Sequence, residues 1–280
     1  MPTTAERAPA TGYLYRRHSL PVRITHWINA IALTILLMSG LQIFNAHPAL
    51  YWGKSSYAGA PPWLEMGALQ KADGDLVGIT RVFGREFDST GLFGASNNRA
   101  GAPVPRGFPW WTTIPDNAWL SMARSWHFFF AWILVLNGLC YIAHSVGSGH
   151  LARDLAPTGA DWRGVGRSLV DHLRLRHPAG EASKRYNVLQ KFAYLAVVFV
   201  LLPLLLLAGL AMSPWLGAAW PGWVDVVGGR QSARSIHFIG AWLLSGFVLI
   251  HVFEVAVTGL WNNLRSMITG RYRVGGEEGS

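Results

Sequence analysis

The sequence predicts an all-α integral membrane protein, a four-helix bundle with a long, mostly irregular external loop between its first and second helices. Apolar residues make up 51% of the 280 residues and charged residues only 14%, and 14 residues are Trp. That composition is unusual for a soluble protein. Four apolar runs also reach about 20 residues, the length that a helix needs to cross a bilayer. We expect one membrane domain over residues 1–280.

The four runs are expected to be helices because a chain inside the bilayer must satisfy its backbone hydrogen bonds internally. The third run contains no charged residue, and Glu254 lies near the end of the fourth. Pro203 predicts a kink in the third run. The expected spans are residues 24–44, 126–145, 192–212 and 236–257.

The distribution of Lys and Arg predicts the orientation of the spans. Most of these 24 residues lie in the N-terminal segment, in the connection 146–191 and in the C-terminal tail. Short basic connections stay in the cytoplasm. We therefore expect both termini and residues 146–191 in the cytoplasm. The net charge of +9 follows from this topology and does not indicate nucleic-acid binding.

Residues 45–120 form the external loop, which is too long for a simple turn. The loop contains several Trp and many Gly and Pro. Two interpretations stay open: a lid over the outer end of the bundle, and a docking surface for a partner protein.

Histidines in the predicted spans are the main indication of function, because ionisable residues are costly in a bilayer. His26 begins the first span, His127 begins the second, and His237 and His251 lie in the fourth. The last two are 14 residues apart, which puts them near one helix face with an axial separation of about 21 Å. From the direction of each span, we expect His26 level with His251 on the inner side. His127 should be level with His237 on the outer side.

Two glycines fit this arrangement. Gly40 lies near the face of His26 but at the outer level, and Gly138 lies near the face of His127 but at the inner level. Each would leave room for a cofactor ring at its own level. His144 competes for the inner level, but its offset of 17 residues from His127 rotates it by about 100°. We expect an interfacial or packing role for His144.

Two histidines at each level indicate haem and not a bare metal ion. Zinc and non-haem iron usually need three or four converging ligands, whereas a porphyrin leaves two positions on its iron. Two histidines also leave no open position there, which favours electron transfer over oxygen binding. One cysteine and no C-x-x-C-H sequence exclude iron–sulfur clusters and covalent c-type haem. We expect two haems b, ligated by His26 with His251 and by His127 with His237.

Residues 23–27 (RITHW), residues 186–191 (YNVLQK) and the histidines of the fourth span resemble a known family. They are similar to the bacterial di-haem cytochrome b family of the b-561 type. That family includes membrane subunits of formate dehydrogenase, nickel–iron hydrogenase and thiosulfate reductase. The resemblance covers the four predicted helices, and the long external loop departs from it.

The resemblance implies electron transport across a bacterial inner membrane, between a periplasmic oxidoreductase and the quinone pool of a respiratory chain. A molybdenum-containing enzyme is one such partner. The quinone site would lie by the inner haem, with Asn187 as its contact and Gln190 and Lys191 as weaker candidates. Asn187 also suits the N-cap of the third span, and both roles stay open.

Basic residues near the haem levels are candidates for binding haem propionates, because Arg pairs well with carboxylates. Arg23 and Lys191 are the inner candidates, and Arg124, Arg230 and Arg234 are the outer ones. The alternatives are membrane anchoring for the inner set and solvated loop charges for the outer set.

Other functions are open. A stand-alone membrane oxidoreductase would couple a small oxidant or reductant such as superoxide to quinone, but the mixed charges of residues 45–120 support electrostatic steering only weakly. A haem-free anchor or transporter would tolerate His-to-Ala changes, and the matched histidine levels argue against it. We expect an electron-transfer subunit of an oxidoreductase, or a quinone-linked oxidoreductase itself.

Overall fold

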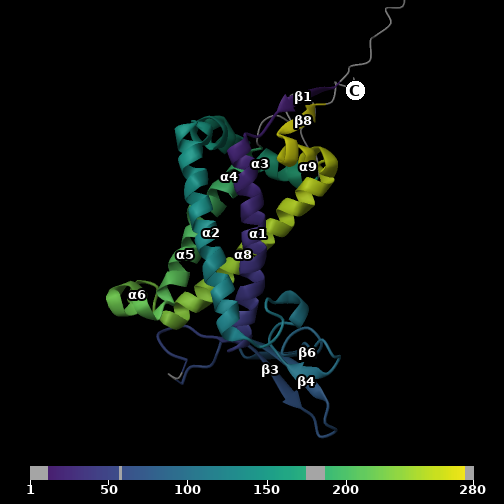
Figure 1. Cartoon of the computed structure of the whole chain (residues 1–280), viewed down its shortest axis with the longest axis vertical. Helices are drawn as coiled ribbons and strands as arrows, with labels where there is room; N and C mark the ends of the chain where they lie inside the picture. The colour runs from purple at the N-terminus through teal and green to yellow at the C-terminus, as the bar shows by residue number, and fades with distance from the viewer. Residues whose placement is uncertain (1–11, 57–58, 175–186, 275–280) are drawn as a thin grey trace, which may run out of the picture. The chain divides into compact units, whose positions relative to one another are not determined.

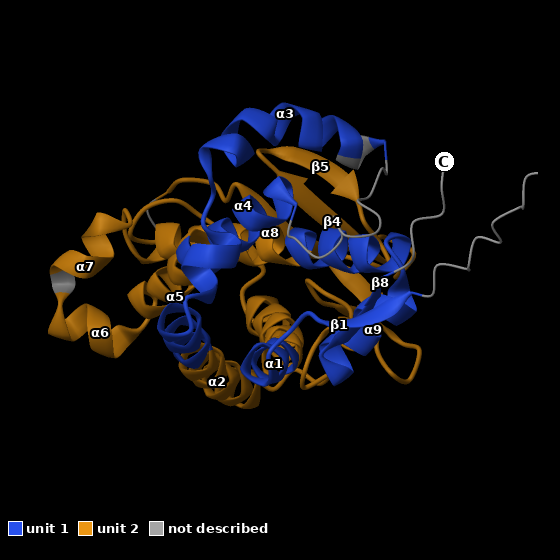
Figure 2. Cartoon of the chain, turned by 90° about the horizontal axis from the view of Figure 1, so that it is seen from above, with its two compact units in different colours: residues 1–27, 138–199, 246–280 blue, residues 28–137, 200–245 orange. Residues whose placement is uncertain are grey.

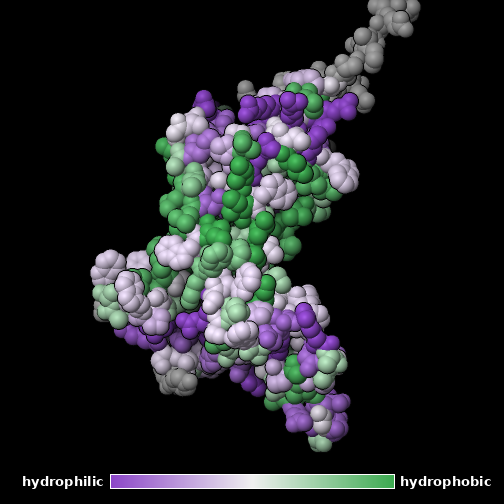
Figure 3. All heavy atoms as spheres, viewed as in Figure 1, coloured by the Kyte–Doolittle hydropathy of each residue, from purple (hydrophilic) through white to green (hydrophobic). Residues whose placement is uncertain are grey.

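The computed structural model describes residues 12–56, 59–174 and 187–274, and these are mostly helical (Figure 1). Within them, four helical segments are long and apolar enough to cross a membrane. They are α1 (Leu20–Asn45), α2 (Leu120–Gly147), the segment Val188–Ala211 and α8 (Arg230–Val257). Figure 3 shows hydrophobic side chains gathered over these helices. A helical membrane protein is therefore confirmed.

The third segment is not a uniform helix. It consists of α4 (Val188–Ala196), the π-helical turn η4 (Val197–Leu201) and α5 (Leu202–Ala211). Pro203 accounts for the change, because a proline has no N–H to donate and its ring crowds the preceding turn. The sequence predicted a kink at Pro203, and the structure has a π-helical turn just before this residue.

The chain divides into two compact units (Figure 2). Unit 1 consists of residues 1–27, 138–199 and 246–280, and unit 2 consists of residues 28–137 and 200–245. The helices α1, α2 and α8 each continue from one unit into the other, so each contributes residues to both.

Residues 45–120, expected to be mostly irregular, contain β-strands in unit 2, so the all-α prediction is not confirmed for the whole chain. An antiparallel sheet is formed, in this order, by β2 (Ala49–Leu50), β3 (Leu64–Gln70), β4 (Leu76–Val82) and β5 (Arg85–Asp88). Strands β6 (Ala95–Asn97) and β7 (Pro103–Pro105) form a separate two-stranded sheet. A 3₁₀ turn, η1 (Trp110–Thr112), follows.

The sheet packs on the end of α1. On β3, Leu64 and Met66 are buried and the intervening Glu65 is half-buried, which is the period-two alternation of a strand. The two buried side chains join a hydrophobic cluster with Leu41 and Phe44 of α1. This contact gives the external loop a core that its Gly and Pro content did not suggest.

Shorter elements connect the spans or flank the first and the last of them. In unit 1 they are the π-helical turn η2 (Leu151–Leu155), α3 (Gly159–Leu173), α9 (Leu260–Thr269), and the strands β1 (Tyr13–Arg16) and β8 (Arg271–Val274), which pair antiparallel. In unit 2, α6 (Pro214–Ala219) and α7 (Pro221–Val226) precede α8.

Candidate functional site

In unit 1, His26 of α1 and His251 of α8 lie next to each other. Their ring centres are 6.1 Å apart and their ring planes are inclined by 64°. One turn before His251, the ring of Phe247 stacks on it at 6.1 Å, and Trp27 packs edge-on against His26 at 5.5 Å. The structure therefore brings together the two histidines that we expected to share the inner level.

In unit 2, His127 of α2 and His237 of α8 form a second pair with the same geometry. Their ring centres are also 6.1 Å apart and their planes are also inclined by 64°. Each ring has a hydrogen-bond partner at Nδ1. His127 Nδ1 lies 3.1 Å from the hydroxyl oxygen of Ser39, and His237 Nδ1 lies 2.8 Å from the carbonyl oxygen of Leu205.

These contacts determine which ring nitrogen holds the proton. A carbonyl oxygen only accepts, so the Nδ1–H of His237 donates to Leu205. The Ser39 hydroxyl already donates to the carbonyl of Ile35 at 2.6 Å, so it accepts from the Nδ1–H of His127. In both residues the lone pair of Nε2 is then available to a metal. A hydrogen bond from the second ring nitrogen is the usual support of a histidine ligand.

Glycines lie beside both histidines of unit 2. A Cβ atom at Gly40 would lie 3.4 Å from Cε1 of His127, and a Cβ atom at Gly209 would lie 3.4 Å from Cε1 of His237. A longer side chain at either position would displace the imidazole, because packed interiors leave little room for added atoms. In unit 1, a Cβ atom at Gly138 would meet no described residue within 4 Å.

The spacing within each pair fits one iron between two imidazoles. A metal–imidazole bond is about 2 Å long and the ring centre lies about 1 Å beyond the nitrogen, so trans imidazoles on one metal have centres about 6 Å apart. Both pairs match this value. Across residues 12–56, 59–174 and 187–274, His, Cys, Asp and Glu form no group of three or more that could hold a bare metal ion. Two imidazoles are the donors that a haem iron takes besides its porphyrin.

Two residues considered for the inner level have other contacts. His144, the competing ligand, has its Nε2 atom 3.2 Å from the hydroxyl of Ser19. Arg23, a propionate candidate, donates to the backbone carbonyl of Ile268 and thereby joins α1 to α9.

Lys191 and Asn187 also bind protein groups. Lys191 forms an ion pair of 3.0 Å with Asp161 of α3, and both side chains are largely buried. Asn187 is the N-cap of α4. Its side chain accepts from the N–H of Leu189 at 3.3 Å, and the Gln190 side chain accepts from the Asn187 N–H at 3.1 Å. The capping role that we considered for Asn187 is therefore present.

The outer propionate candidates differ in their surroundings. Arg234 of α8 donates to the backbone carbonyls of His47 and Ala49. These hydrogen bonds connect the start of β2 to α8. Arg124 and Arg230 are exposed.

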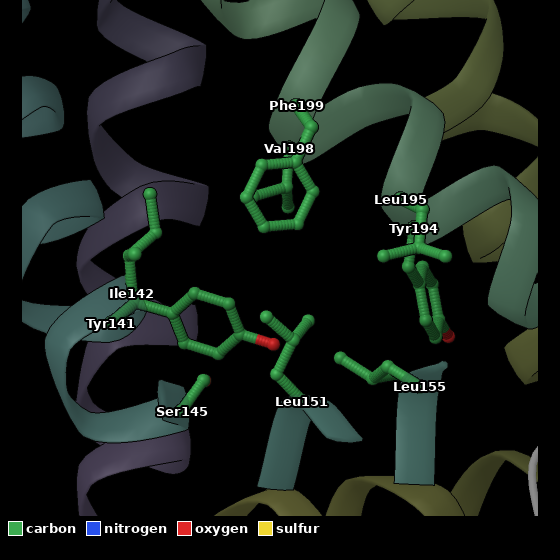
Figure 4. A pocket seen from close by; sticks show the side chains of 9 residues that line it. All are labelled: Tyr141, Ile142, Ser145, Leu151, Leu155, Tyr194, Leu195, Val198 and Phe199. Carbon is green, nitrogen blue, oxygen red and sulfur yellow. The ribbon is translucent and has the colours of Figure 1, made fainter. Parts of the chain in front are cut away.

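A small cavity in unit 1 lies between the end of α2, η2 and the third helical segment (Figure 4). Its volume of about 10 Å³ has room for one water molecule. The hydroxyl of Tyr141 points into it (Figure 4). Tyr194 also lines it, and the Tyr194 ring packs edge-on against Phe247 at 6.4 Å. Since Phe247 stacks on His251, aromatic rings connect this cavity to the histidine pair of unit 1.

Apolar spans with paired histidines define a class of protein, the membrane cytochromes of the b type. A family model described as Prokaryotic cytochrome b561 matches residues 17–270. The chain belongs to this family, and the resemblance inferred from the sequence is confirmed.

Two relatives support the assignment. The chain is 27% identical over 257 residues to the putative protein-methionine-sulfoxide reductase subunit YedZ1 of Azospira oryzae, covering 92% of this chain and 98% of that protein. It is 22% identical over 287 residues to a probable Ni/Fe-hydrogenase B-type cytochrome subunit of Cupriavidus necator, covering 95% and 91%. No solved structure matches the chain. The protein is thus a bacterial membrane cytochrome of the b type, a family that binds haem b and transfers electrons.

Proposed function

We propose that the chain holds two haems b, one between His26 and His251 and one between His127 and His237, and passes electrons between them across the membrane. The main support is the equal geometry of the two pairs, each with ring centres 6.1 Å apart. Two histidine ligands leave no open position on the iron, which suits electron transfer. Helix α8 contributes one ligand to each haem.

In the proposed topology both termini lie in the cytoplasm, because the Lys and Arg residues concentrate on that side. The haem of unit 2 then lies near the periplasm, as do residues 45–120. A periplasmic oxidoreductase, of the molybdenum-containing class, would dock there and exchange electrons with this haem. Both relatives are named as oxidoreductase subunits, which favours an oxidoreductase as the partner.

The haem of unit 1 is proposed to exchange electrons with membrane quinone. A quinone carbonyl needs a hydrogen-bond donor, and Tyr141 and Asn187 each offer one. Tyr141 is favoured, because the cavity it enters is joined by aromatic rings to His251. A quinone ring is larger than this cavity, so its binding requires the lining side chains to move apart.

A stand-alone enzyme acting on superoxide is the second candidate, and ion pairing argues against it. Attraction of a small anion requires a positive field around the outer haem. Several cations of residues 45–120 are already neutralised by carboxylates. These ion pairs join Lys54 to Asp225, Arg81 to Glu65 and Glu86, and Arg99 to Asp116.

The number of haems tests the proposal. Pyridine haemochrome analysis of the detergent-purified protein should give two haems b per chain. The variants His26→Ala and His127→Ala should each retain one haem. His144→Ala is the matched control and should retain both, since His144 bonds Ser19. A colourless protein would refute the proposal, and one haem in the unchanged protein would mean that one pair is wrong.

A further inference from the structure

The two-stranded ribbon of β1 and β8 in unit 1 has one basic face. In its antiparallel register, Leu14 stands opposite Arg273 and Arg16 stands opposite Arg271. Opposed residues share a face of a ribbon, as do residues two positions apart. The three arginines and Leu14 therefore lie on one face, and all four side chains are exposed.

The charges of this face are not neutralised by the described part of the chain, where none of the three arginines has an ion-pair partner. Like charges directly opposite each other destabilise a strand pair, and an arginine does not lose its proton in proteins. On the opposite face Val274 is buried, whereas Tyr13 and Tyr15 are exposed and carry no charge. An anion bound by Arg16 and Arg271 would offset their repulsion.

Helix α9, which precedes the ribbon strand β8, has polar residues on its inner side and apolar ones outside. Ser266 is 1% exposed, and Asn263 donates to the hydroxyl of Thr258 at 2.9 Å. The large apolar side chains are outside, with Trp261 81% exposed and Ile268 59% exposed. Water is an unfavourable surrounding for such a face, whereas the membrane interface suits it.

Hydrogen bonds join the helix to the ribbon, and the helix follows the end of a span in the chain. The Asn262 side chain donates to the carbonyl of Arg273 at 2.8 Å and accepts from its N–H at 2.9 Å. Figure 1 shows α9, β1 and β8 side by side. Helix α9 begins at Leu260, directly after α8 ends at Val257. This surface therefore follows the end of a candidate span and lies at the membrane boundary.

We propose that α9 and the β1–β8 ribbon bind anionic phospholipid. Trp261 and Ile268 would lie at the boundary of the acyl chains, and Arg16, Arg271 and Arg273 would bind the phosphate groups. Arginine suits this role, because its planar donors match phosphate oxygens. Basic clusters beside a membrane span are typical sites for anionic lipids. This proposal is independent of the haems.

Native mass spectrometry of the haem-containing protein tests the lipid site, with phosphatidylglycerol or phosphatidylcholine added at equal concentration. The unchanged protein should retain several-fold more phosphatidylglycerol. The variant Arg16→Gln/Arg271→Gln should lose most of this preference. The control Lys71→Gln/Arg85→Gln removes the same charge from exposed strand-end positions in unit 2 and should keep the preference. An unchanged haem spectrum shows that each variant is folded.

Three results would overturn the proposal: equal retention of the two lipids by the unchanged protein, a preserved preference in the ribbon variant, or an equal loss in the control. The apolar part has its own measurement. Brominated phosphatidylglycerol should quench more tryptophan fluorescence in the unchanged protein than in Trp261→Phe. Equal quenching would exclude α9 from the lipid surface.

Discussion

Replacing Ser39 by alanine would test how the protein sets the redox potential of the proposed haem in unit 2. Ser39 is fully buried, and its oxygen lies 3.1 Å from Nδ1 of His127. Its hydroxyl hydrogen is directed to the carbonyl of Ile35, so the oxygen is an acceptor for the histidine. An acceptor at Nδ1 makes the imidazole a stronger electron donor through Nε2. Such a ligand favours ferric over ferrous iron, and Ser39→Ala should therefore raise the midpoint potential.

The magnitude follows from the strength of one hydrogen bond. A neutral hydrogen bond contributes about 1 kcal/mol net. For a one-electron couple, about 59 mV corresponds to a tenfold change in the equilibrium constant, or about 1.4 kcal/mol. If only the ferric state loses the hydrogen bond, the potential rises by about 40 mV. A loss shared between the two states gives less, so we expect a rise of about 20–40 mV.

The assay is a redox titration of the purified protein, followed by its visible spectrum. Ser245→Ala is the matched control, because the Ser245 hydroxyl donates to the carbonyl of Ala241 within its own helix at 2.8 Å. One haem should shift upward in Ser39→Ala, and the other should keep its potential. An unchanged or lowered potential would refute the reasoning. An equal shift in the control would show that a Ser-to-Ala change in a span has this effect without a contact to His127.

Two further substitutions test the surroundings of the site. Gly40→Leu should displace the ring of His127, because a Cβ atom alone would already lie 3.4 Å from it. Pyridine haemochrome analysis should then find one haem per chain, whereas the control Gly40→Ala should keep both haems. Lys191→Met leaves Asp161 as a largely buried, unpaired carboxylate and should lower the free energy of unfolding by about 2 kcal/mol, measured by reversible denaturation in mixed micelles. The backbone N–H of Thr158 and the ammonium group of Lys191 lower the pKa of Asp161, so the stabilisation is present at neutral pH and is lost as the pH falls through that pKa. The two proteins should therefore become equally stable in acid, and a difference that persists there would contradict the ion-pair explanation.

The spans and the histidine pairing could be predicted because both follow from properties of a single helix. Apolar length identifies a span, and the rise per residue with the direction of each span gives the depth of every histidine. The strands of residues 45–120 could not be predicted in this way. Their alternating runs are short and interrupted by Gly and Pro, and β3 is stabilised by tertiary packing against Leu41 and Phe44 of α1.

The partners of the site residues were less predictable than the residues themselves. The carbonyl of Leu205 gives no signal in a sequence, because every residue has a carbonyl. The role of Ser39 depends on tertiary packing, because its contact with His127 forms only where α1 and α2 pack together in unit 2. Depth alone did not identify the partner of Lys191, because Asp161 lies 30 residues earlier in a separate helix.

The regular and irregular helices differ in what they contribute. The proposed haem ligands all come from α1, α2 and α8, each of which is a continuous α-helix. A change of pitch between His237 and His251 would rotate one imidazole away from its partner, since each added residue turns the helix face by about 100°. The π-helical turns η2 and η4 carry no proposed ligand, and both line the cavity through Leu151, Leu155 and Val198. Such turns are frequent at functional sites. Tyr141 of the ligand helix α2 lines the same cavity, so the proposed quinone would contact both α2 and the two π-helical turns. We expect its entry to displace residues of the turns and to leave the proposed haem ligands in place, because none of these histidines lines the cavity.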